Sequence, residues 1–399
     1  MTTQTFQTLD TLEVAGKRVL VRVDFNVPLK EGLVTDDTRI RAALPTIREL
    51  FDRKAHSLVL MTHVGRPQGI GIEPEFSTAS IARTLASYLG EKHPVVHVAD
   101  IAGQEALRAA QSLNQGEILL VENLRFDPRE KKGDEGFAQK LAALGEVYVN
   151  DAFGTAHRAH ASVATVARLM PSAAGLLMQR EVETLKSLTT DPDRPFVAIL
   201  GGSKVSDKIG VIEALLTRVD ALVVGGAMCF TFLKAQGFEV GKSLVEDDWI
   251  ERCKTLMAQA NELGVDLIIP TDVVEAAEFA ADAFCQTVDV DAMSPEMMGL
   301  DIGSKTVERI AAVVAGAKII FWNGPMGVFE MPAFSHGTRG VAEALAKASG
   351  TTIIGGGDSV AAVELFNVAD QMDYISTGGG ASMKLLEGAD MPALEPLWR

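Results

Sequence analysis

Short apolar runs alternate along the whole chain with longer stretches that carry apolar residues at helical spacing. In the first half the runs cover residues 19–23, 58–62, 95–98, 118–121 and 147–150; in the second half they cover 196–200, 221–224, 266–269, 318–321, 351–354 and 374–376. Runs rich in Val and Ile that are separated by helices predict βαβ units, and therefore parallel sheets with helices on both faces. We expect an α/β protein with two doubly wound, Rossmann-like parallel sheets.

One stretch interrupts this alternation. Residues 171–188 have a proline near their start, apolar positions at helical spacing and no strand character, and the segment 191–195, with two prolines, ends the helix that they predict. A chain of 399 residues is also too long for one ordinary core. We therefore expect an N-terminal domain at residues 1–170, a connecting helix or hinge at 171–190 and a C-terminal domain at 191–385.

Composition and charge exclude several classes of protein. A formal net charge of −16 argues against a nucleic-acid binder, because such proteins neutralise phosphates with Lys and Arg. No apolar run approaches the roughly 20 residues that cross a bilayer. The opening segment 1–7 has neither the basic start nor the apolar stretch of a signal peptide. Three widely spaced cysteines, Cys229, Cys253 and Cys285, favour free thiols. We expect a cytoplasmic protein with no membrane or nucleic-acid partner.

The first half of the chain places its positive side chains after its strands. Residues 1–170 hold 20 Lys and Arg against 21 Asp and Glu, whereas residues 171–399 hold 17 against 32. Ligands of open parallel sheets bind beyond the carboxyl ends of the strands. The polar residues at these ends are Asp24, Asn26, His63, Arg66, Arg125, His157, Arg158 and His160, with Arg39 nearby. Because guanidinium groups pair with carboxylate and phosphate, the set predicts a site for a small polyanion, although a solvated face or a helix cap explains any one arginine better.

Two histidines of this set are spaced like metal ligands. His157 and His160 lie three residues apart, but no pair of carboxylates and no cysteine completes a ligand set at a recognisable spacing. We therefore expect no metal at these histidines.

Two glycine-rich turns follow strands of the second half. The sequence GGSKVSDK occupies residues 201–208, and GGGDS occupies 355–359. Glycines let the backbone approach phosphate oxygens, a following helix offers its N–H groups, lysine supplies charge, and aspartate can hold a magnesium ion. Lys204 and Lys208, four residues apart, are expected on one helix face that points to a common anion. These turns predict a nucleotide site.

Two other phosphate-binding motifs do not fit the chain. Residues 237–243 look like a P-loop, but only three residues separate the glycines where the motif needs four, and a helix-like stretch precedes them. The G-x-G-x-x-G pattern is absent after every expected strand. A Walker-type NTPase and a dinucleotide-dependent dehydrogenase are therefore disfavoured.

From end to end the chain resembles the phosphoglycerate kinase family. The motifs that carry the resemblance are VDFNVP (23–28), HVGRP (63–67), ENLRF (122–126), NDAFGTAHRAH (150–160), GGSKVSDKI (201–209), WNGPMGVFE (322–330), GGGDS (355–359) and STGGGAS (376–382). Eight motifs in the family's order are far more specific than any one of them. The resemblance implies a reversible phosphoryl transfer between 1,3-bisphosphoglycerate and ADP, which gives 3-phosphoglycerate and ATP in glycolysis and gluconeogenesis.

The resemblance also implies a role for each matched residue. Its phosphoglycerate-binding positions are Asp24, Phe25, Asn26, Arg39, His63, Val64, Gly65, Arg66, Arg125 and Arg158. Its nucleotide-binding positions are Lys204, Lys208, Asn323, Glu330, Gly356, Gly357, Asp358 and Ser359, with Asp358 on Mg²⁺ and Glu330 near the ribose. The groups implied to flank the transferring phosphoryl group are Arg39, Lys204, Gly379 and Gly380.

The implied chemistry needs no general base. The acceptor in the direction of ATP use is a carboxylate, which is already ionised at neutral pH. The reaction instead needs neutralisation of the negative charge on the phosphoryl oxygens, and alignment of two anions that repel each other. The resemblance further implies a monomer whose domains close on their substrates, and a C-terminal tail, about 386–399, that packs on the first domain.

The chain departs from the family at a few positions. Ser359 stands where many relatives have threonine, and Ala227 and Cys229 stand where relatives often have glycine and other small or polar residues. Two alternative functions stay open at this point. One is a dinucleotide-dependent dehydrogenase, and the other is a non-catalytic scaffold that kept the fold, because fold alone does not fix function.

Overall fold

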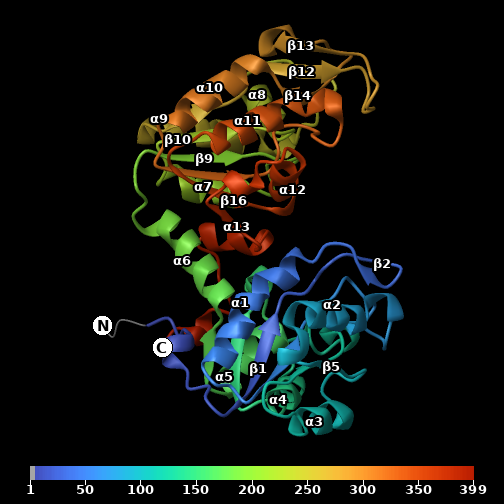
Figure 1. The fold of residues 1–399 in the computed structure, drawn as a ribbon. Helices are drawn as coiled ribbons and strands as arrows, with labels where there is room; N and C mark the ends of the chain where they lie inside the picture. Colours follow the sequence, from blue (N-terminus) through green and yellow to red (C-terminus); the bar gives the residue numbers. More distant parts are fainter. Residues whose placement is uncertain (1–4) are drawn as a thin grey trace. The chain divides into compact units, whose positions relative to one another are not determined.

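The computed structural model describes residues 5–399, and the chain divides into two compact units. Unit 1 contains residues 1–184 and 390–399, and unit 2 contains residues 185–389 (Figure 1). The first four residues belong to the expected N-terminal domain and to the opening segment considered for a signal peptide, and they lie outside the described part. Within residues 5–399 no helix combines the length and the apolar character needed to cross a membrane.

A six-stranded parallel sheet forms the centre of unit 1. Its strands lie in the order β5 (Val95–His97), β6 (Ile118–Leu120), β4 (Ser57–Met61), β1 (Arg18–Val23), β7 (Val147–Asp151) and β8 (Ser172–Ala174). Because successive strand residues point to opposite faces, Val19 and Val21 of β1 enter one core and Leu20 enters another. The first core includes residues of α1 (Thr38–Asp52) and α2 (Ala79–Leu89). The second includes residues of α3 (Gln104–Gln111), α4 (Glu135–Ala142) and α5 (Val166–Leu169).

Smaller elements and the C-terminal segment complete unit 1. A hairpin joins β2 (Leu29–Lys30) to β3 (Leu33–Val34) through Glu31 and Gly32, both at positive φ, as a two-residue turn requires. A π-helical segment, η6 (Ala161–Thr165), precedes α5. In the C-terminal segment the ring of Trp398 lies 4.8 Å from that of Phe6.

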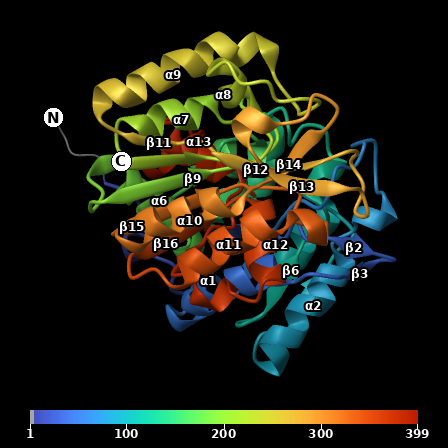
Figure 2. The ribbon, with the colours of Figure 1, turned by 90° about the horizontal axis from the view of Figure 1, so that it is seen from above.

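A second six-stranded parallel sheet forms the centre of unit 2. Its order is β11 (Asp266–Ile268), β10 (Ala221–Val224), β9 (Phe196–Leu200), β15 (Ile319–Asn323), β16 (Thr351–Gly355) and β17 (Tyr374–Ile375). In chain order this is 3-2-1-4-5-6, the order of a dinucleotide-binding fold. Figure 2 shows α7 (Ile209–Leu216), α8 (Cys229–Ala235) and α9 (Ile250–Leu263) on one side of the sheet. It shows α10 (Ser304–Ala315), α11 (His336–Ala346) and α12 (Gly357–Leu365) on the other, and α13 (Gly380–Leu386) follows the last strand.

Unit 2 also contains an antiparallel sheet that the hydrophobic pattern does not predict. Strand β12 (Asp272–Ala276) pairs with β13 (Cys285–Asp289) on one edge and with β14 (Met298–Ile302) on the other. Three of the five residues of β13 are exposed, so they do not form an apolar run. Its pairing depends on distant segments of the chain, which a local pattern cannot reveal.

All eleven expected strands are present, and the parallel sheets confirm the expected fold class. One expectation was wrong. The stretch 171–188 was expected to have no strand character, but Ser172–Ala174 forms β8 and pairs in parallel with β7. Three small residues carry no β-branched signal, and the buried edge of β7 supplies the pairing. The helix that follows, α6 (Leu176–Thr190), contains the division between the two units, after residue 184.

Candidate active site

The charged residues expected after the strands of unit 1 meet at one edge of its sheet. Asp24 follows β1, His63 follows β4 and Arg125 follows β6, and these three strands are neighbours. The chain order of the strands reverses on the two sides of β1, which makes this edge the crevice in which open α/β sheets bind ligands. We call the residues Asp24, Asn26, Arg39, His63, Gly65, Arg66, Arg125 and Arg158 the anion cradle.

Hydrogen bonds between loops fix the shape of the anion cradle. Arg39 Nη1 donates to Asp24 Oδ2 at 2.5 Å, and the Gly65 N–H donates to Asn26 Oδ1 at 2.8 Å. Arg125 Nη1 donates to the Gly65 carbonyl at 2.5 Å. Asp24 Oδ1 and Arg125 Nε are buried and have no partner among the described atoms. A buried polar atom without a hydrogen bond costs about 1–3 kcal/mol, so this acceptor and this donor mark places for a ligand.

The electrostatics of the cradle favour an anion. Burial, and then the charges of Arg158 and Arg22, lower the pKa of Arg125 to about 10. Burial, and then Arg22, Arg125, Arg158 and Arg39, hold the pKa of His63 well below its ordinary value. The guanidinium groups therefore repel one another in the free protein, and a bound polyanion relieves that repulsion.

Two expected residues contribute no side chain to the cradle. The side chains of Phe25 and Val64 are buried in the hydrophobic core. The Phe25 N–H donates to Thr62 Oγ1 at 2.9 Å, and the Val64 N–H donates to Asn123 Oδ1 at 3.2 Å. Any contact that these residues make with a ligand therefore passes through the backbone. Arg66, in contrast, has an exposed side chain.

The two histidines at metal-like spacing lie among cations. Burial, and then Arg158 and other cations, lower the pKa of His160 to about 3. His157 Nε2 lies 3.3 Å from Arg158 Nε. Among residues 5–399 no group of three or more His, Cys, Asp or Glu side chains is placed to hold a metal ion.

In unit 2 the glycine-rich turns line two adjoining cavities. The smaller, of about 380 Å³, is lined by both turns and by the start of α13; the larger, of about 530 Å³, is lined mainly by apolar side chains. Gly202, Ser203 and Asp358 line both. The two cavities, which we call the phosphate cavity and the apolar cavity, lie at the carboxyl ends of β9 and β15, where the strand order reverses.

The phosphate cavity brings together the expected polar residues of unit 2. Its lining includes Lys204, Lys208, Asn323, Gly356, Gly357, Asp358, Ser359, Gly379 and Gly380. Lys208 Nζ donates to Asn323 Oδ1, and Ser359 Oγ accepts from the Gly324 N–H at 2.6 Å. Burial lowers the pKa of Lys208 to about 8, against the opposing effect of Asp358 and other carboxylates. Lys384 and Glu387, which form an ion pair at 2.6 Å, also line this cavity and were not predicted.

One local expectation in this cavity was wrong. Lys204 and Lys208 were expected on a helix face, but α7 begins only at Ile209, and both lysines lie in the turn before it. Gly202 has a φ of 121°, a conformation that a right-handed helix does not allow, so the helix cannot begin directly after β9. Both lysines nevertheless line the same cavity.

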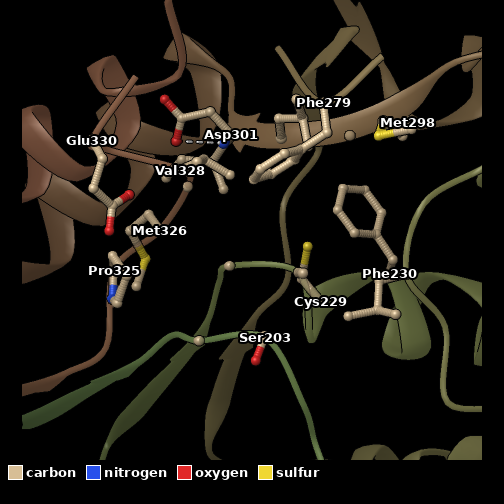
Figure 3. A pocket seen from close by; sticks show the side chains of 18 of the residues that line it. Ser203, Cys229, Phe230, Phe279, Met298, Asp301, Pro325, Met326, Val328 and Glu330 are labelled. Carbon is tan, nitrogen blue, oxygen red and sulfur yellow. Dashed lines mark hydrogen bonds between the residues drawn. The ribbon is translucent and has the colours of Figure 1, made fainter. Parts of the chain in front are cut away.

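The apolar cavity is built largely from residues that were not predicted. Figure 3 shows Phe230, Phe279 and Met298 on one side of it and Pro325, Met326 and Glu330 on the other. Met298 belongs to β14, Phe279 to the connection between β12 and β13, and Phe230 to α8. Glu330, an expected nucleotide contact, is exposed at this cavity and does not line the phosphate cavity. A planar, largely apolar group fits such a lining.

Asp301 is a buried carboxylate in the wall of the apolar cavity. Its side chain accepts hydrogen bonds from the Gly337 N–H at 2.7 Å and the Ile302 N–H at 2.9 Å. Burial nevertheless raises its pKa to about 7. A carboxylate inside an otherwise apolar segment, 298–302, was the signal in the sequence that could have drawn attention to it.

Comparisons with known proteins agree with this site. A family model described as phosphoglycerate kinase matches residues 9–389. A phosphoglycerate kinase of Moorella thermoacetica is 55% identical over 390 residues, which cover 98% of each chain, and one of Rippkaea orientalis is 53% identical over all of this chain and 99% of the relative. The solved structure of phosphoglycerate kinase from Coxiella burnetii aligns with a TM-score of 0.89 at 41% identity, over 98% of this chain and 99% of the other.

The positively charged sheet edge of unit 1, and in unit 2 a glycine-lined cavity beside an apolar one on a dinucleotide-binding fold, are typical of a phosphotransferase that acts on an anionic acceptor. The chain belongs to the phosphoglycerate kinase family. It transfers a phosphoryl group reversibly between 1,3-bisphosphoglycerate and ADP, and its carboxyl-group acceptor is 3-phosphoglycerate. The resemblance noted from the motifs is thereby confirmed, and the dehydrogenase and scaffold alternatives are set aside.

Proposed function

We propose that the anion cradle binds the phosphoglycerate substrate and that the two cavities of unit 2 bind the nucleotide, its base in the apolar cavity and its phosphates in the phosphate cavity. The unpartnered Asp24 Oδ1 and Arg125 Nε carry the first assignment, because they offer one acceptor and one donor to a small hydroxylated anion. The adjoining pair of cavities carries the second, since a nucleotide joins an apolar base to a polyanion.

The residues around the transferred group act on its charge. The acceptor carboxylate is an adequate nucleophile, so Arg39 and Lys204 serve to neutralise the phosphoryl oxygens, with the backbone N–H groups of Gly379 and Gly380 as further donors. The glycines lie at the start of α13, and Gly379 has a φ of 48°. Each well-placed donor of this kind is worth about 3 kcal/mol.

The residues present fit a magnesium nucleotide. Asp358 lies in the first turn of α12, exposed, beside both cavities. One carboxylate that shares Mg²⁺ with substrate phosphates is the usual arrangement for this ion, which would there neutralise phosphate charge. Asp358 would hold the ion, and Ser359, whose hydroxyl accepts from Gly324, would hold the turn in place.

Direct transfer requires both substrates to meet at one phosphoryl group. We propose that the two units close on their substrates and that the residues around α6, about 171–190, with the C-terminal residues 386–399, form the hinge. We also propose that the enzyme is a monomer that works in the cytoplasm, as its membership of the phosphoglycerate kinase family suggests.

The test measures Mg²⁺-dependent ATP consumption with 3-phosphoglycerate, by coupled NADH oxidation. Arg66→Ala should raise the KM for 3-phosphoglycerate about tenfold or more, the worth of a hydrogen bond to a charged group, and leave the KM for ATP unchanged. Asp358→Ala should remove the Mg²⁺ dependence together with most turnover. Arg108→Ala, an exposed arginine of α3, is the matched control. A loss of ATP affinity in Arg66→Ala would contradict the assignment of the two sites.

A further inference from the structure

Beneath the anion cradle lies a chain of buried hydrogen bonds that the proposed function does not use. Arg22 Nη2 lies 3.0 Å from His63 Nδ1, and Arg22 Nε donates to Ser162 Oγ at 2.9 Å. Ser162 Oγ donates to Glu130 Oε1 at 2.6 Å, and its N–H donates to Glu130 Oε2 at 2.9 Å. The side chains of Arg22, Ser162 and Glu130 are all fully buried. We call these three residues the Arg22 relay.

The direction of each hydrogen bond in the relay follows from simple donor and acceptor chemistry. A guanidinium group has only donors, so His63 Nδ1 must accept the hydrogen bond from Arg22. The one hydroxyl proton of Ser162 must go to Glu130, because its oxygen already accepts from Arg22. The imidazole proton of His63 is therefore on Nε2.

The other protonation states of His63 are disfavoured by the same geometry. A proton on Nδ1 would face the N–H of Arg22 at 3.0 Å, and the nearest carboxylate oxygen, Asp24 Oδ1, lies 3.9 Å away, too far for a hydrogen bond. An imidazolium would be repelled by four guanidinium groups, those of Arg22, Arg125, Arg158 and Arg39. Within residues 5–399, Asp24 alone has a carboxylate oxygen within 4.0 Å of the ring nitrogens. Burial adds to this penalty, since His63 is 4% exposed.

From this geometry we propose that Arg22 is a positioning residue that holds His63 as the neutral Nε2–H tautomer, so that His63 donates a hydrogen bond to an oxygen of the bound phosphoglycerate. The proposal rests on the placement of that substrate in the anion cradle. Among the described contacts His63 Nε2 has no partner within the protein, so its proton is available to a ligand. The arginines of the cradle already supply positive charge, and a neutral N–H donor adds a hydrogen bond of defined direction to the substrate oxygen.

Ser162 and Glu130 give the relay its rigidity. A buried guanidinium is costly unless its donors are satisfied, and Arg22 also donates to the Val23 carbonyl. The π-helical segment η6 places both the N–H and the hydroxyl of Ser162 on Glu130. Such segments often occur at functional sites, and here Ser162 of the segment contacts Arg22, which in turn contacts His63.

The first test is a direct measurement of the tautomer in the wild-type enzyme. Long-range ¹H–¹⁵N spectra of protein labelled with ¹⁵N-histidine distinguish a protonated from an unprotonated ring nitrogen, and His63→Gln assigns the signal. We expect His63 to show Nε2 protonated and Nδ1 unprotonated from pH 6 to pH 8. A proton on Nδ1, or an imidazolium at pH 7, would overturn the proposal. This measurement needs no relay variant, so it remains decisive even if such a variant fails to fold.

The second test removes the arginine. Arg22→Met should mix the two tautomers of His63 and raise the KM for 3-phosphoglycerate about tenfold, the lower end of the losses seen when the partner that orients a histidine ligand is removed. Arg18→Met removes one positive charge from the same strand and should change neither quantity. If the tautomer in Arg22→Met is unchanged, Arg22 does not position His63. An unchanged KM for 3-phosphoglycerate in His63→Gln would instead refute the proposed substrate site while leaving the tautomer result intact.

Discussion

The anion cradle of unit 1 and the phosphate cavity of unit 2 differ in how they would hold the anionic groups that we propose for them. In the cradle, hydrogen bonds hold charged side chains such as those of Arg39 and Arg125 in place, and Arg22, outside the cradle, contacts His63 through a buried hydrogen bond. The phosphate cavity depends more on backbone than the cradle does, because seven of its 17 lining residues are glycines. Side chains determine the charge and shape of the cradle. In the phosphate cavity, the glycines leave space in which a ligand can approach the backbone.

This difference determines how each site can be damaged. Removing atoms from a guanidinium group of the cradle should weaken binding of the small substrate, while adding atoms to a glycine of the phosphate cavity should weaken binding of the nucleotide. Lys204 also matters in unit 2 through its side chain, which is exposed and brings mobile charge to the phosphate cavity.

Loss of Lys204 should therefore have the largest effect. Lys204→Ala should lower kcat about 100-fold or more, since a donor aimed at a transition-state charge is worth about 3 kcal/mol, and it should leave both KM values nearly unchanged. Steady-state kinetics in both directions measure this. Lys347→Ala, an exposed lysine of unit 2, serves as the control. A loss confined to the KM for ATP would show that Lys204 belongs to ground-state binding.

A methyl group on Gly356 should break the backbone site. This glycine has a φ of 90°, and a Cβ there would lie 2.8 Å from Asn323 Nδ2. Gly356→Ala must displace the side chain that holds Lys208, and strain of about 1–3 kcal/mol should weaken ADP binding about tenfold. Calorimetry with ADP checks this. Gly316→Ala, where φ is ordinary and no atom is closer than 4.0 Å, should bind ADP like the wild type. Equal affinities in both variants would refute the backbone description.

The sequence predicted the parallel sheets because buried parallel strands are continuous apolar runs. It did not predict β8 or the antiparallel sheet β12–β14, whose residues are small or half polar and whose pairing is set by distant strands. The same limit applies to the site. Residues at strand ends, such as Asp24 and Asp358, could be placed from strand boundaries alone, whereas Phe279 and Met298 depend on the antiparallel sheet.

Arg22 was missed for another reason. An arginine inside the apolar run 19–23 was accepted as part of a strand, although a charged residue in a fully buried strand needs a buried partner. That partner, Ser162 with Glu130, is more than 100 residues away and is positioned by a π-helical segment. No local pattern predicts this pairing, but the presence of Arg22 within an apolar run could have drawn attention to it.

The smallest predicted effect is a proton uptake on ligand binding, which should distinguish Lys208 of the phosphate cavity from the arginines of the anion cradle. Burial lowers the pKa of Lys208 to about 8, so near pH 9 most Lys208 in the free enzyme is neutral. The arginines of the cradle stay mostly protonated at that pH, even Arg125, whose pKa burial lowers to about 10. A bound phosphate favours the charged form of Lys208. Lys208 should therefore take up a large fraction of one proton when ADP binds near pH 9, and little when ADP binds near pH 7. The second phosphate pKa, about 6, is too low to contribute there.

Calorimetry in two buffers of different ionisation enthalpy measures this uptake. Lys208→Met should abolish it, and 3-phosphoglycerate, for which we propose binding by arginines, should show much less uptake in the wild type. Proton uptake with 3-phosphoglycerate of the same size would mean that the anion cradle also depends on a titrating group, and the contrast between the two sites would then fail.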